Sequence, residues 1–199
     1  DAADFLDRLI TNHLPSRTGA IVLTHLLNRR GRIEIELTVV RLAEQRFYLV
    51  CAVFYEQRLV DHLNNHLVSE DVDIVVRSEE WSALSLQGPK SRMVLSANTD
   101  AALDNEAFPW LSAQCISIAG CPVWALRMSY AGELGWELYH PIAYNLHLFE
   151  EICRAGEAYG LKHCGYRAIE SLRLEKSYRA IYRDLDLEHT ALEAGLDRF

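Results

Sequence analysis

The sequence predicts an α+β protein in which helices and antiparallel strands follow one another along the chain. Residues 33–39 alternate apolar and polar side chains, which is the period of a strand with one buried face. Residues 58–67 place Leu59, Leu63 and Leu67 at helical spacing. Because this mixed order recurs in the second half, we expect two ferredoxin-like layers, at residues 1–80 and 81–199.

The first half is expected to hold two helices and four strands. Its helices are predicted at residues 3–12 and 58–67, and its strands at 20–27, 33–39, 47–53 and 72–76. The 47–53 strand is almost continuously apolar, which is typical of a central strand. The 72–76 strand is predicted from the alternation of Val72, Ile74 and Val76.

The second half repeats the theme. Strands are predicted at residues 82–86, 115–119, 123–130 and 136–140, and helices at 89–96, 142–158 and 165–178. The two middle strands are expected to form a hairpin around Gly120. In the 142–158 helix, Leu146, Phe149 and Cys153 share one face, which predicts that this face packs on the core.

Composition excludes several classes of partner. The chain has 199 residues, half of them hydrophobic, and a formal net charge of −8, which disfavours a nucleic-acid partner. No apolar run is long enough to span a bilayer, so no membrane partner is expected. The cysteines number five and include no CxxC pair, which favours reduced thiols and a cytoplasmic or mitochondrial-matrix location.

Common cofactor motifs are absent from the sequence. No GxGxxG or phosphate-loop pattern occurs, so a dinucleotide or nucleoside triphosphate is not expected to bind in the usual way. His62 and His66 have helical i, i+4 spacing, but no third ligand can be named for a metal. We therefore predict no metal site, and two solvated histidines on a helix surface.

The most informative segment runs from Tyr130 to Tyr139 and reads Tyr-Ala-Gly-Glu-Leu-Gly-Trp-Glu-Leu-Tyr. Two strand-like pieces flank a loop with Gly132 and Gly135, and glycine lets a backbone take positive φ or approach a ligand closely. Glu137 lies in the second piece. Two interpretations stay open from the residues themselves: a ligand-binding loop, or a tight connection between strands with surface carboxylates.

Four segments resemble, in order, the motifs of the aminomethyltransferase (glycine-cleavage T-protein) superfamily, in the branch fused to sarcosine and dimethylglycine dehydrogenases. The Tyr130–Tyr139 segment is similar to the signature Tyr-x-Gly-Glu-x-Gly-x-Glu of that superfamily. The others are the Leu-Gln-Gly-Pro turn, the Arg-Leu-Glu helix and the Thr-Pro-Leu-Glu-Ala-Gly-Leu segment, which match residues 86–89, 165–176 and 190–196. The resemblance covers nearly the whole chain and implies the folate-binding fold of that family, incomplete here at both ends.

The resemblance implies that three residues bind tetrahydrofolate. Glu137 matches the carboxylate that accepts two hydrogen bonds from the pterin edge, and Tyr130 matches the aromatic residue that lines the ring. Arg173 matches the arginine that contacts the more distal part of the folate, where its fork suits an anionic group. From the residues alone, the favoured interpretation of Arg173 is a helix-surface pair with Glu170, three residues earlier.

The resemblance also implies a catalytic role for Glu36. The family has an aspartate at this position, where it assists one-carbon transfer by acid–base or electrostatic action. Glutamate is one methylene longer, and an exposed strand residue without chemistry is the alternative. Two further positions depart from the family: Leu23 stands where an aromatic residue is frequent, and Ile181-Tyr182 stands where Tyr-Gly or Trp-Gly is usual.

The function implied is uptake by tetrahydrofolate of a one-carbon unit from oxidative demethylation of an N-methyl amine such as sarcosine or dimethylglycine. FAD is expected only in a separate flavin oxidoreductase domain or subunit. Two alternatives remain open: a non-catalytic folate-binding or scaffold module, and a standalone aminomethyltransferase of glycine cleavage.

Overall fold

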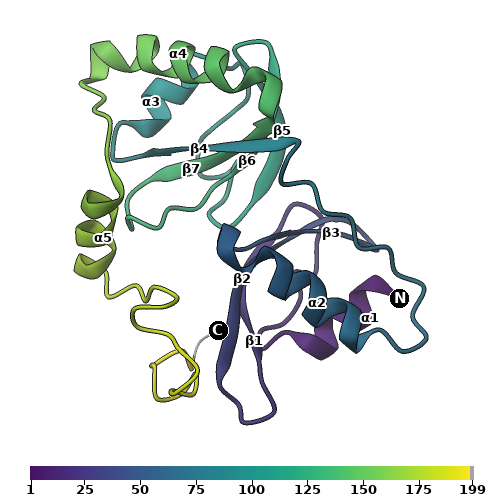
Figure 1. The fold of residues 1–199 in the computed structure, drawn as a ribbon. Helices are drawn as coiled ribbons and strands as arrows, with labels where there is room; N and C mark the ends of the chain where they lie inside the picture. Colours follow the sequence, from purple (N-terminus) through teal and green to yellow (C-terminus); the bar gives the residue numbers. More distant parts are fainter. Residues whose placement is uncertain (198–199) are drawn as a thin grey trace. The chain divides into compact units, whose positions relative to one another are not determined.

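The computed structural model describes residues 1–197, and it confirms an α+β fold with two antiparallel sheets and their covering helices (Figure 1). The chain divides into two compact units. The first contains residues 1–75 together with the segment from Arg179 onward, and the second contains residues 76–178. The C-terminal segment therefore groups with the first unit, a return that the expected division at residue 80 did not include.

The first unit is a three-stranded sheet covered on one face by two helices (Figure 1). Its elements are α1 (Ala2–Leu9), β1 (Ile21–Leu27), β2 (Ile33–Ala43), β3 (Arg46–Val50), the short 3-10 helix η1 (Val53–Tyr55) and α2 (Glu56–His66). Along β2, Ile35, Leu37 and Val39 are fully buried against α1 and α2, as the alternation predicts. The opposite face of β2 carries Glu34 and Glu36, which are half-buried rather than exposed.

Two predictions for this unit are wrong. The apolar strand over 47–53 is not central: β2 pairs with both neighbours, and β3 lies at the edge with its residues mostly half-buried. Residues 72–76 form no strand. Val72 and Ile74 pack against the core without joining a ladder, whereas Val76 is exposed. Alternation reports which side chains face the core, and it carries no information on whether a partner strand is available.

The second unit is a four-stranded antiparallel sheet in the order β4-β7-β6-β5. Its elements are β4 (Trp81–Gln87), α3 (Ser91–Ser96), β5 (Ala113–Ile118), β6 (Cys121–Leu126), β7 (Gly135–Pro141), η2 (Ile142–Tyr144), α4 (Asn145–Gly156), η3 (Glu157–Tyr159) and α5 (Tyr166–Glu175). The helices α3 and α4 lie side by side over one face of this sheet (Figure 1). Trp136 on β7 is fully buried, with its ring centroid 6.1 Å from that of Phe108.

The buried face of α4 differs from the prediction. Leu148 and Ile152 face the core, whereas Leu146 is 67% exposed and Phe149 is 41% exposed. Both sets have helical spacing, so they form competing apolar stripes on one helix. The stripe that packs best against the sheet becomes buried, and helical spacing alone does not show which of the two stripes that is.

The C-terminal segment is held in the first unit by the stretch that resembles the fourth family motif. Leu196 packs with Ile33 and Leu185 in a small core of its own. Thr190 and Glu193 bond reciprocally, since the Thr190 backbone donates to the Glu193 carboxylate at 2.8 Å and the Glu193 backbone donates to the Thr190 hydroxyl at 3.2 Å. This motif therefore has a structural role in closing the unit.

Tyr182 has a left-handed backbone with φ 74°, at a position where the family usually has glycine. Its ring contacts those of Phe54 and Tyr55, with centroids 5.4 Å and 5.6 Å away. The left-handed φ gives the physical reason for a glycine at this turn.

The cysteines are all free thiols, as predicted. None of the helices in the described part of the chain combines the length and the apolar character that crossing a bilayer requires.

Candidate functional site

Glu137 presents a carboxylate from the middle of the sheet of the second unit. It lies on β7 opposite Ser85 of β4 and Leu126 of β6. Its carboxylate accepts a hydrogen bond of 2.8 Å from the Tyr139 hydroxyl, and no lysine or arginine within residues 1–197 forms an ion pair with it. Desolvation by the surrounding protein raises the pKa of Glu137, and the Tyr139 hydrogen bond opposes that shift only in part.

The loop before Glu137 is fixed by the turn that follows β4. The Gly88 backbone donates to the Leu134 carbonyl at 2.8 Å, and the Ala131 backbone donates to the Gln87 side chain at 3.2 Å. The two family-like motifs, some 45 residues apart in the sequence, therefore form one structural unit.

Glycine is required at the two positions of the loop for different reasons. Gly132 has φ 69°, the left-handed conformation predicted for a glycine here. Gly135 is needed for space, because a Cβ at this position would lie 2.9 Å from the Leu86 carbonyl oxygen on β4. The first glycine shapes the loop, and the second lets β7 approach β4.

Tyr130 and Arg173 are linked through Tyr178, a residue that sequence reasoning missed. The rings of Tyr130 and Tyr178 stack with centroids 6.4 Å apart. The guanidinium of Arg173 donates to the Tyr178 carbonyl at 2.7 Å. The signal available was an aromatic residue five positions after Arg173, at the end of the helix predicted over residues 165–178.

Arg173 is buried and engaged within the protein. It is 3% exposed, and its Nη2 lies 3.1 Å from the Glu170 carboxylate. Glu170 is buried as well. The pair with Glu170 is therefore present, but inside the protein rather than on a helix surface, and the contact of Arg173 with a ligand stays a prediction.

A pocket of about 310 Å³ lies beside the signature loop. Gly132, Glu133 and Gly135 line it, with Tyr178 and the exposed Trp110 on other sides. This pocket brings the loop and the aromatic residue beyond α5 to one surface of the second unit.

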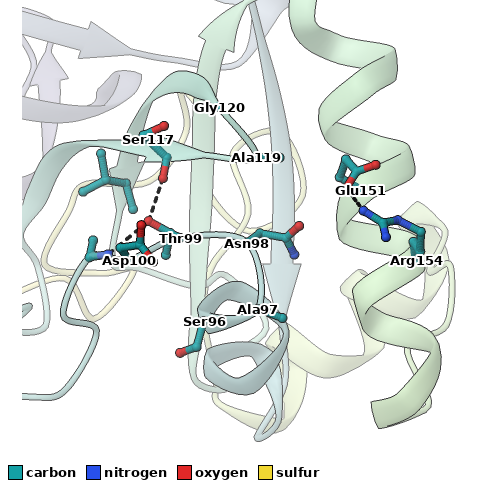
Figure 2. Close-up of a pocket in the computed structure, with 12 residues that line it drawn as sticks. Ser96, Ala97, Asn98, Thr99, Asp100, Ser117, Ala119, Gly120, Glu151 and Arg154 are labelled. Atoms are coloured by element: carbon teal, nitrogen blue, oxygen red, sulfur yellow. Dashed lines mark hydrogen bonds and ion pairs between the residues drawn. The ribbon is translucent and has the colours of Figure 1, made fainter.

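A larger pocket of about 570 Å³ lies in the same unit, and neither pocket is lined by Glu36, Tyr130, Glu137 or Arg173. Figure 2 shows Glu151 and Arg154 pointing toward each other on α4, and Thr99 bonded to the Ser117 carbonyl. In this larger pocket, Glu151 and Arg154 pair with each other and Thr99 bonds to a backbone carbonyl, so the pocket does not suggest a reactive centre. Within residues 1–197, no group of three or more histidine, cysteine or acidic side chains is arranged to hold a metal.

Glu36 lies in the first unit, on β2, directly opposite His25 of β1. Its carboxylate Oε2 is 3.4 Å from the Nε2 atom of His25. The Glu36 side chain is 24% exposed and that of His25 is 1% exposed. Glu36 is therefore half-buried rather than exposed, and both its catalytic role and the alternative of a strand residue without chemistry stay predictions.

The fold and these residues define a class: an α+β chain with two antiparallel sheets, in which a half-buried, desolvated carboxylate follows a glycine-bearing loop in the second unit. The chain belongs to the GCVT N-terminal domain family, whose model matches residues 1–199. The predicted family resemblance is thereby confirmed.

Individual relatives agree with this membership. Sarcosine dehydrogenase, mitochondrial, of Mus musculus is 40% identical over 98% of this chain and 22% of its own length. Dimethylglycine dehydrogenase, mitochondrial, of Rattus norvegicus is 35% identical over 100% of the chain and 23% of its length. The solved structure of the glycine cleavage system aminomethyltransferase T from Bartonella henselae superposes with a TM-score of 0.80 and 26% identity, over 95% of this chain and 50% of that one. The chain thus spans less than a quarter of the two dehydrogenases.

Proposed function

We propose that this chain binds tetrahydrofolate and supports transfer to it of a one-carbon unit from oxidative demethylation of an N-methyl amine such as sarcosine or dimethylglycine. The observation that carries this proposal is the carboxylate of Glu137. It is desolvated, its pKa is raised, and its hydrogen bond comes from a neutral phenol. A desolvated carboxylate without a cationic partner is stabilised by a ligand that donates N–H groups.

The residues present fit a reduced folate. Glu137 would accept the two adjacent N–H groups of the pterin edge, and Tyr130, held against Tyr178, would pack on the ring. Arg173 would contact the distal, anionic part, which requires it to share donors now directed at Glu170 and Tyr178. Tetrahydrofolate supplies a nucleophilic nitrogen that captures the one-carbon unit.

Glu36 would act as the acid–base residue. When an iminium carbon is captured, the overall exchange forms two carbon–nitrogen bonds to the folate and breaks both bonds of the carbon–nitrogen double bond to the amine. The folate loses two N–H protons, of which the departing amine takes up one and the other is released. Glu36 would accept that proton from a folate nitrogen and pass it to water. Oxidation of the amine belongs to FAD in a separate domain or subunit, in line with the two dehydrogenases named above.

The free cysteines and the mitochondrial names of these relatives favour a reducing compartment, the cytoplasm or the mitochondrial matrix. One alternative function is a non-catalytic folate-binding or scaffold module, and its scaffold form is favoured by a specific observation: Arg173 is already paired with Glu170, and a scaffold needs no rearrangement of that pair. A standalone aminomethyltransferase is the other alternative.

Calorimetric titration with folinic acid, a stable reduced folate, tests the binding proposal. We expect Glu137→Ala to weaken binding by roughly 10- to 100-fold, the loss of one to two hydrogen bonds to a charged group. Glu150→Ala is the control, since Glu150 is exposed on α4 and lines neither pocket, and it should retain affinity. Equal affinity of the Glu137 variant and the wild type would contradict the assignment of Glu137. Binding without any acceleration of one-carbon transfer would favour the non-catalytic module.

A further inference from the structure

His25 is a buried histidine whose ring has no hydrogen bond of its own. It is fully buried, yet neither Nδ1 nor Nε2 has a hydrogen-bond partner among residues 1–197. A buried polar group left without a partner costs about 1–3 kcal/mol. Its backbone, by contrast, is held on both sides, because His25 N donates to the Thr11 hydroxyl at 3.2 Å and Thr11 N donates to the His25 carbonyl at 3.1 Å. The backbone of His25 is thus fixed, whereas its ring nitrogens have no hydrogen-bond partner.

The carboxylate of Glu36 lies beside this ring. Its Oε2 lies 3.4 Å from Nε2, close enough for an ion pair but not in hydrogen-bonding geometry. The backbone positions of the two residues face each other across β1 and β2, so only the Glu36 torsions need to change for a hydrogen bond to form. Glu36 retains that freedom, because it is 24% exposed.

The neighbouring carboxylate shows that this arrangement is particular to Glu36. Glu34, on the same strand and of similar exposure, lies 3.5 Å from the guanidinium of Arg58 and 3.5 Å from the ring of His62. No lysine or arginine within the described residues forms an ion pair with Glu36. One carboxylate is therefore compensated by a permanent charge, and the other only by a histidine that can be neutral.

We propose that His25 is a positioning residue for Glu36, in addition to the proposed one-carbon transfer and resting on it. The Nε2–H group of His25 holds one oxygen of the Glu36 carboxylate, so the other oxygen is directed at the nitrogen that loses its proton. A glutamate side chain has several rotatable bonds, and a fixed donor removes part of the freedom that these bonds give to the carboxylate. The proton goes to Glu36, and His25 contributes only the hydrogen bond.

The experiment is a double-mutant cycle in the rate at which the chain converts formaldehyde and tetrahydrofolate to methylenetetrahydrofolate and water, above the spontaneous rate. We expect His25→Leu to lower kcat by about tenfold, with little change in KM for tetrahydrofolate, because positioning affects the transition state more than binding. His25→Gln, which keeps an N–H donor, should recover most of the loss. In a Glu36→Gln background, His25→Leu should have no further effect.

Two results would overturn the proposal: equal loss from His25→Leu in both backgrounds, or a rise in KM alone. Glu34→Gln is the matched carboxylate control and should keep kcat. Nitrogen NMR of labelled histidine gives a readout that does not need turnover, since Glu36→Gln should shift the Nε2 signal of His25. An unchanged signal contradicts the pairing.

The outcomes also separate this inference from the proposed function. If the wild-type chain does not bind folinic acid, both the proposed function and the proposed role of His25 are contradicted. If the wild-type chain binds folinic acid and the Glu36→Gln variant keeps full activity, the proposed roles of Glu36 and His25 are contradicted, whereas the folate site is still supported.

Discussion

The phenol of Tyr139 donates a hydrogen bond of 2.8 Å to the carboxylate of Glu137, two residues earlier on β7. Residues two apart on a strand share a face, so this contact follows from local geometry. A neutral donor stabilises the carboxylate less than a cation does, and burial therefore determines the direction of the pKa shift.

This direction predicts how stability depends on pH. The folded pKa of Glu137 is raised above its ordinary value of 4.5, so the folded state favours the protonated form. The corresponding stability is present below the unfolded pKa and is lost as pH rises through the folded pKa. Glu137→Gln should therefore gain free energy of unfolding relative to wild type between pH 4 and pH 8, measured by urea titration. Glu133→Gln should show no such trend, and a Glu137→Gln variant that loses stability at pH 8 would refute the prediction.

The left-handed backbone of Tyr182 predicts an inverted order of two substitutions. Tyr182→Ala and Tyr182→Gly both remove the contacts with Phe54 and Tyr55, but only glycine adopts φ 74° without strain. We expect the glycine variant to be more stable than the alanine variant by about 1 kcal/mol in chemical denaturation. At Tyr144, where φ is −95°, alanine should be at least as stable as glycine. The same order at both sites would show that strain at residue 182 is unimportant.

The buried pair of Arg173 and Glu170 predicts a large cost for breaking it from one side. Arg173→Ala leaves a carboxylate that is 8% exposed without its guanidinium, and we expect a loss of about 3–5 kcal/mol in unfolding free energy. The double variant Arg173→Met with Glu170→Leu should recover much of that loss. A variant Arg173→Ala that is nearly as stable as wild type but no longer binds folinic acid would instead assign Arg173 to the ligand.

The thiols should differ strongly in reactivity. Burial, with a smaller effect from Glu56, raises the pKa of Cys51 from 9.0 to about 11. A rise of that size reduces the thiolate fraction at pH 8 by about a hundredfold. Brief alkylation followed by mass spectrometry should therefore modify the exposed Cys115 and Cys164 first and spare Cys51. Rapid labelling of Cys51 in the folded chain would contradict this placement.

The sequence by itself determined the element types and the positions of the motifs. The alternation along β2 correctly predicted its buried face, because the period of a strand places every second side chain on the core. The segment from Tyr130 to Tyr139 predicted a left-handed Gly132 and a strand that carries Glu137. Each of these properties depends on residues a few positions apart.

Only the tertiary structure decided which residues meet. The edge position of β3, the buried stripe of α4 and the pairing of His25 with Glu36 depend on partners that are distant in the sequence or on competing surfaces of equal spacing. Local periodicity records how a side chain faces, whereas pairing is set by which surfaces fill the core together. For that reason the sequence predicted Glu36 as a candidate without its histidine, and Arg173 without the depth at which it is buried.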